Sequence, residues 1–210
     1  ERETIEALAR RRLQAGEGAD GPLAHFKRFL KLETDRLRMR HRFGLGGLEI
    51  ATARSHQVDQ VVAHACRLAL AEAGPDARIA LAGCAAVALG GYGRGELAPF
   101  SDVDLLFLHQ GRAQDAVRAF VERVLQLLWD TGLTVGHSFR TVAECLDEAR
   151  GDLHSRTALG EARLVAGDAA VFAALDRSLD RTIRRDRRTG EAFAESVRQE
   201  MLKDDRFADV

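Results

Sequence analysis

The segment Ala88–Leu108, ALGGYGRGELAPFSDVDLLFL, decides the fold of this 210-residue chain. An apolar run over Ile79–Leu89 leads into the glycine-rich segment Gly90–Gly95, and after a short polar link a second apolar run follows over Leu105–Leu108. Short apolar runs that are bounded by glycine are typical of buried strands. The segment therefore predicts two strands joined through a tight glycine turn.

Two carboxylates stand at the start of the second strand, in the sequence Ser101-Asp102-Val103-Asp104. Because residues i and i+2 of a strand share one face, Asp102 and Asp104 are expected to point the same way, with Val103 opposite. Two neighbouring carboxylates repel each other and are costly to bury, and a divalent cation removes that cost. The pair predicts a Mg²⁺ site, and a solvated strand edge is the alternative interpretation.

The glycines before this pair present backbone N–H groups without side chains, which suits an anion such as phosphate. An ordinary tight turn is the alternative. The spacing Gly91-x-Gly93-x-Gly95 lacks the G-x-G-x-x-G order of dinucleotide sites, and no G-K-[ST] follows it. The joint pattern of strand, Gly-Gly, Asp-x-Asp and strand is more specific than either part, and it indicates a site for a metal and a nucleoside triphosphate.

Gly90-Gly91 followed by Ser101-Asp102-x-Asp104 resembles the signature of the DNA polymerase β-type nucleotidyltransferase superfamily. The longer string GGYGRGEL-x-P-x-SD-x-DLL is similar to the N-terminal domain of the bacterial uridylyltransferases that modify the nitrogen-regulatory PII protein. The similarity covers about residues 79–168. Downstream it is carried by LWD-x-GL from Leu128, VGHS-x-RT from Val135 and EARL-x-AGD from Glu161.

This resemblance implies an α/β (α+β) fold, with a polymerase β-like core, a small mixed sheet, and N-terminal and C-terminal helices at its flanks. It implies that the catalytic residues Asp102 and Asp104 hold Mg²⁺ or Mn²⁺. The backbone of Gly90 and Gly91 would bind phosphates of UTP. The implied reaction transfers UMP to a tyrosine hydroxyl of PII and releases pyrophosphate.

Further site residues are expected around this centre. Arg94 is either a cationic phosphate clamp or a surface arginine, and Ser101 either binds phosphate or caps the turn. The superfamily usually places a third carboxylate on the neighbouring strand, but residues 135–140 contain no acid. Glu161 is the candidate third metal ligand, with a salt bridge to a nearby arginine as its alternative. His137 is either a metal or nucleotide contact or a core histidine.

Composition limits the classes of function. The net charge of −1 gives no overall basic field, so nucleic-acid binding is not expected. The three cysteines, Cys66, Cys84 and Cys145, form no C-x-x-C pair, which argues against a zinc site and favours a reducing, cytoplasmic location. No apolar run approaches the length of a membrane span, and the first residues do not read as a signal peptide.

Hydrophobic spacing predicts an N-terminal helical segment over 1–75, a nucleotidyltransferase core over 76–168 and a C-terminal helical segment over 169–210. Helices are expected over 4–15, 23–43, 48–73, 114–130, 142–150, 153–165, 169–182 and 191–203. Strands are expected over 79–89, 103–108 and 133–140.

Full-length enzymes of the resembled family continue into an HD-type phosphohydrolase region and ACT repeats, whereas no His-Asp dipeptide occurs in this chain. We therefore expect a transferase domain truncated before the HD and ACT regions, with no response to glutamine. One alternative is adenylyl transfer from ATP, as in the glutamine synthetase adenylyltransferases; the segment Tyr92–Gly95 and the pair His137-Ser138 favour uridylyl transfer. Another is a non-catalytic nucleotide-binding regulatory domain, which the missing strand carboxylate weakly supports.

Overall fold

The computed structural model describes residues 21–112, 114–181 and 195. At its centre is a four-stranded mixed sheet in the order β3-β2-β1-β4. The strands are β1 (Ala85–Ala88), β2 (Val103–His109), β3 (Val135–Thr141) and β4 (Arg163–Gly167). β1 pairs antiparallel with β2 and β4, and β2 pairs parallel with β3. The predicted α/β class with a small mixed sheet is confirmed.

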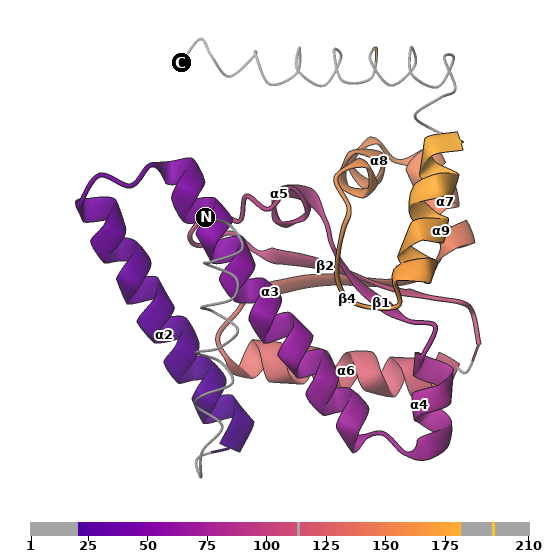
Figure 1. Ribbon diagram of the computed structural model, residues 1–210. Helices are drawn as coiled ribbons and strands as arrows, with labels where there is room; N and C mark the ends of the chain where they lie inside the picture. The colour runs from indigo at the N-terminus through magenta and orange to yellow at the C-terminus, as the bar shows by residue number, and fades with distance from the viewer. Residues whose placement is uncertain (1–20, 113, 182–194, 196–210) are drawn as a thin grey trace.

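Helices cover both faces of this sheet (Figure 1). One layer contains α2 (Gly21–Arg42), α3 (Gly47–Glu72), α4 (Pro75–Leu81) and α6 (Gln114–Asp130). The other contains α7 (Val142–Gly151), α8 (Leu153–Gly160) and α9 (Ala169–Leu179). The short helix α5 (Gly90–Gly93) follows β1 at the edge of the second layer.

Alternate residues of β2 enter two separate cores. Leu105 and Phe107 belong to the core shared with α3 and α6, whereas Leu106 and Leu108 belong to the core shared with α7, α8 and α9. A strand that is covered on both faces needs apolar residues at nearly every position. This is why the second strand reads as a continuous apolar run after Asp104.

Most of the predicted helices are found within a few residues of their expected bounds. The helix expected over 114–130 is α6, and its Val117, Val121, Val124 and Leu128 are buried at the spacing of one helical face. The helix expected over 48–73 is α3, which ends just before Gly74-Pro75. The helix expected over 4–15 lies outside the described residues, as does the one over 191–203 apart from residue 195.

The strand predicted over Ile79–Leu89 is wrong in its first half. Residues Pro75–Leu81 form α4, and only Ala85–Ala88 form the strand β1. Pro75 occupies the start of α4, where its missing N–H costs nothing, and Asp76 lies in the first turn, where a negative charge is favourable. Ile79 is 77% exposed, so its apolar character marks no buried strand.

The helix predicted over 153–165 is also wrong in part. α8 ends at Gly160, and Arg163–Gly167 form β4 at the edge of the sheet. Gly167 has a φ of +96°, and a Cβ at this position would overlap the carbonyl oxygen of Cys84, so only glycine fits there. β4 is short and partly buried along most of its length, and it is defined by pairing with β1 rather than by an alternating sequence.

Candidate active site

The predicted carboxylate pair lies at the start of β2. Val103 is buried in the core with α3 and α6, so Asp104 projects from the opposite face of the strand. Partial burial of its carboxylate raises the pKa of Asp104, and the negative charge of Asp102 raises it further. The two carboxylates are therefore close enough to repel each other, which is the condition under which a divalent cation is favoured.

The neighbouring strand leaves room for Asp104. Gly136 of β3 is the register partner of Asp104. A Cβ at Gly136 would lie 2.5 Å from Asp104 Oδ1, closer than real side chains approach. The position opposite Asp104 thus holds no third carboxylate, because the Asp104 side chain itself occupies the space.

Asp104 borders two cavities. The first, of about 360 Å³, brings together the predicted residues Gly91, Ser101, Asp102 and Asp104. The second, of about 280 Å³, is bordered by Gly90 and Asp104 and extends toward α8. Asp104 is therefore common to both cavities, the first of which includes Gly91 and the second Gly90.

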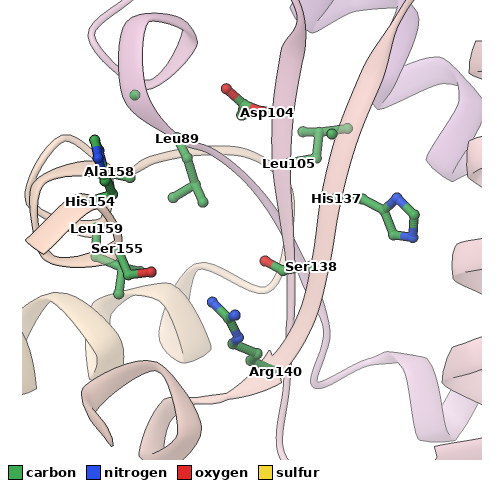
Figure 2. Close-up of a pocket in the computed structure, with 12 residues that line it drawn as sticks. Leu89, Asp104, Leu105, His137, Ser138, Arg140, His154, Ser155, Ala158 and Leu159 are labelled. Atoms are coloured by element: carbon green, nitrogen blue, oxygen red, sulfur yellow. The ribbon is translucent and has the colours of Figure 1, made fainter. Parts of the chain in front are cut away.

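Figure 2 shows the second cavity. Ser138 and Arg140 project from β3 on the same side as Asp104 and face α8, which contributes His154 and Ser155. The sequence reasoning missed these side chains as site residues. The one sequence signal for Ser138 and Arg140 was their i, i+2 spacing from Gly136, which places all three residues on one face of β3.

His137 lies on the other side of β3 (Figure 2). Its ring packs edge-on against Trp129, with 5.8 Å between the ring centroids. The side chain is exposed, so His137 is not a core histidine, although its residue borders the second cavity. The ring of His137 therefore points away from Ser138 and Arg140.

The glycine segment folds as α5. Gly90 has a φ of +56°, which favours glycine, and Gly93 donates its N–H to the carbonyl of Leu89 at 2.9 Å. A Cβ on Gly93 would overlap the carbonyl oxygen of Glu161. Gly93 is therefore required for close packing of α5 against the end of α8.

A partly buried polar network fixes α5 to the helical layer. Arg163 of β4 donates two hydrogen bonds to the carboxylate of Asp59 on α3, at 2.9 and 3.0 Å. Tyr92 of α5 donates its hydroxyl to the same carboxylate at 2.8 Å. Arg163 also donates to the backbone carbonyls of Tyr92 and Gly93. Two other elements, α3 and β4, thus hold the glycine segment in position.

Arg94 and Glu161, which were predicted separately, form an ion pair. Arg94 Nη1 donates to Glu161 Oε2 at 2.6 Å, and Arg94 Nε donates to Glu96 Oε2 at 3.0 Å. These hydrogen bonds raise the pKa of Arg94. Glu161 therefore adopts the salt bridge that was its alternative assignment. Across the described residues, no three His, Cys, Asp or Glu side chains form a group able to hold a metal ion.

The segment that holds this site also matches a known protein family. Residues 38–138, just under half of the chain, match the family described as "Putative nucleotidyltransferase DUF294". This range includes the glycine segment, the carboxylate pair and most of β3. The chain therefore contains a domain of the nucleotidyltransferase class.

Within that class, the chain is similar to proteins named bifunctional uridylyltransferase/uridylyl-removing enzyme. It is 39% identical to the one from Nitrosococcus oceani over 77% of this chain and 17% of the relative. The protein from Pseudomonas putida is 43% identical over 71% of this chain and 16% of its own length. The protein from Azospirillum brasilense is 48% identical over 46% of this chain and 10% of its own length. The chain thus spans only about a sixth or less of the length of these relatives.

Within the ranges that the structure describes, no helix has the length and apolar character required to cross a membrane.

Proposed function

We propose that this domain transfers UMP from UTP to a tyrosine hydroxyl of the PII protein and releases pyrophosphate. The observation that carries the proposal is the carboxylate pair Asp102 and Asp104 beside the glycine segment, in a chain similar to enzymes named uridylyltransferases. The expected cytoplasmic location belongs to the same proposal.

The donor set fits a divalent cation. Asp104 carries a raised pKa because of partial burial and the charge of Asp102, and the pair offers the oxygen ligands that Mg²⁺ and Mn²⁺ take. When bound, such an ion would supply positive charge to the phosphoryl oxygens and the departing pyrophosphate. Asp102 and Asp104 are the residues that would hold it, and the triphosphate oxygens would complete its ligands.

The two cavities suggest separate positions for donor and acceptor. In an in-line displacement, the attacking oxygen and the leaving oxygen lie on opposite sides of the phosphorus atom. We assign the triphosphate to the cavity of Gly91, Ser101 and Asp102, and the acceptor hydroxyl to the cavity of Ser138 and Arg140. The tyrosine oxygen forms a bond to the α-phosphorus, the bond from that phosphorus to the pyrophosphate oxygen breaks, and the hydroxyl proton leaves to solvent.

The experiment that tests this function is an intact-mass measurement on purified PII. PII is incubated with the chain, Mg²⁺ or Mn²⁺, and either UTP or ATP. A gain of one UMP with UTP alone is the expected result. A gain of AMP would show that the reaction is adenylyl transfer and not uridylyl transfer. No gain with either nucleotide contradicts transfer to PII, and binding of UTP by such a sample would point to a regulatory domain.

A further inference from the structure

A third cavity, of about 470 Å³, lies between α2, α3 and the loops that precede β2 and β3. Two arginines, Arg38 and Arg54, border it together with His41, and none of the described residues around it is acidic. A concave surface bordered by cations without carboxylates attracts an anion. Of the residues that border it, only Ser101 was predicted as a site residue.

Arg54 is the less neutralised of the two arginines. Its Nε is enclosed and has no hydrogen-bond partner, and burial lowers the pKa of the guanidinium, with no described carboxylate opposing that effect. Arg38, by contrast, is largely exposed and pairs with Asp35 at 3.3 Å. A half-buried cation without a counter-ion is costly, and a bound anion would remove that cost.

The fold holds Arg54 next to the loop that leads to Asp102 and Asp104. Ser55, its neighbour on α3, accepts a hydrogen bond from the N–H of Leu97 at 2.8 Å. Leu97 lies in the loop between α5 and the carboxylate pair. Phe100 and Ser101 of the same loop border both the Arg54 cavity and the cavity of Asp102 and Asp104. The two cavities therefore adjoin along this loop.

We propose that Arg54 is a phosphate-binding residue of the donor site, where it contacts the terminal phosphates of the triphosphate and then the pyrophosphate. This inference rests on the proposed function. A guanidinium matches phosphate oxygens through paired hydrogen bonds, and Arg54 borders the adjoining cavity without an acidic partner. Arg94, the cation that the sequence suggested, is already bound to Glu96 and Glu161.

Calorimetric titration with inorganic pyrophosphate and Mg²⁺ tests this role. The samples are the wild type, Arg54→Met, Arg54→Lys and the matched control Arg38→Met, which borders the same cavity but pairs with Asp35. We expect Arg54→Met to weaken pyrophosphate binding about tenfold or more, because a charged hydrogen-bond partner is lost. Arg54→Lys should lose less, and Arg38→Met should change binding less than about twofold. Circular dichroism confirms that each variant is folded.

A second titration locates the phosphate that Arg54 contacts. UTP binding should weaken in Arg54→Met by the same factor as pyrophosphate binding, while UMP binding should not change. The assignment would be overturned if Arg54→Met weakened UMP binding equally, or if it bound pyrophosphate with wild-type affinity. It would also be overturned if the wild type did not bind pyrophosphate. Because these readouts measure binding alone, they decide the role of Arg54 even if the mass measurement on PII refutes uridylyl transfer.

Discussion

The carboxylate of Asp104 occupies the space that a side chain at Gly136 would fill. The two residues are register partners on parallel strands, and a Cβ at Gly136 would lie 2.5 Å from Asp104 Oδ1. The superfamily pattern leads one to expect an acid on this neighbouring strand. The packing shows instead that Gly136 of β3, which has no side chain, leaves this space to the carboxylate of Asp104.

Gly136→Ala should therefore abolish nucleotidyl transfer while leaving the fold intact. The added methyl group forces the Asp104 carboxylate away from its position, and because the atom that moves is the end of a side chain, we expect a loss no greater than the low end of the about 1–3 kcal/mol typical of overpacking. Transfer activity and urea unfolding, measured on the same samples, check both effects. Gly47→Ala is the matched control, since its added Cβ meets no atom within 4 Å. A fully active Gly136→Ala would contradict the role given to this contact.

Removal of either carboxylate charge should eliminate transfer. Asp102→Asn and Asp104→Asn each remove one of the two candidate metal ligands, and we expect a loss on the order of a thousandfold or more. Binding of Mn²⁺ to the same variants, followed by electron paramagnetic resonance, should weaken in parallel. Asp147→Asn, in an exposed ion pair on α7, serves as the control. Wild-type turnover in Asp102→Asn would refute the metal role.

The sequence predicted the centre of this site better than its surroundings. Asp102, Asp104 and the glycine segment are adjacent in the chain, so local periodicity was enough to place them together. Arg54 comes from the middle of α3, where one arginine in an amphipathic helix carries no signal of its own. Likewise β4 is recognisable only through its pairing with β1, and its sequence continued the helical pattern of α8. Apart from α4, where the apolar run outweighed the local helix-start signal of Pro75, the features that were missed depend on contacts between distant residues.

The network around Asp59 should contribute to both stability and activity. Arg163→Met removes the two hydrogen bonds to Asp59 and leaves this carboxylate, whose side chain is 15% exposed, without its main cation. We expect a loss of about 1.5–3 kcal/mol in the free energy of unfolding, measured with urea. Tyr92→Phe removes one hydrogen bond to the same carboxylate and should cost about 1 kcal/mol. Because Arg163 also binds the carbonyls of α5, its loss should lower transfer more than Tyr92→Phe does.

Arg140 should act on the acceptor rather than on the donor. It borders the cavity beside Asp104 and is held by Glu148 at 3.2 Å. Arg140→Met should raise KM for PII about tenfold with little change in KM for UTP, since it removes a cation from the acceptor side alone. Arg150→Met, in an exposed pair with Asp147, controls for loss of surface charge. A rise confined to KM for UTP would reverse the assignment of the two cavities.

His109 should make stability depend on pH near neutrality. The side chain is buried, stacks on Phe139 at 4.0 Å between ring centroids, and accepts the N–H of Gly111 at Nδ1. Burial lowers the pKa of His109 below its ordinary value of 6.5, and the charge of Glu144 opposes this only in part. Well above pH 6.5 the imidazole of His109 is neutral in both the folded and the unfolded state, so it does not contribute to the pH dependence of stability there.

As the pH falls through 6.5, the unfolded state binds the proton first, so stability should fall until the pH reaches the lower pKa of the folded state. The slope from one such group is at most about 1.4 kcal/mol per pH unit. Urea unfolding between pH 8 and pH 5, about 1.5 units on either side of the ordinary histidine pKa, measures it. His109→Gln should flatten this part of the curve, whereas His137→Gln, at an exposed position, controls for loss of a histidine. An unchanged slope in His109→Gln would assign the pH dependence to other groups.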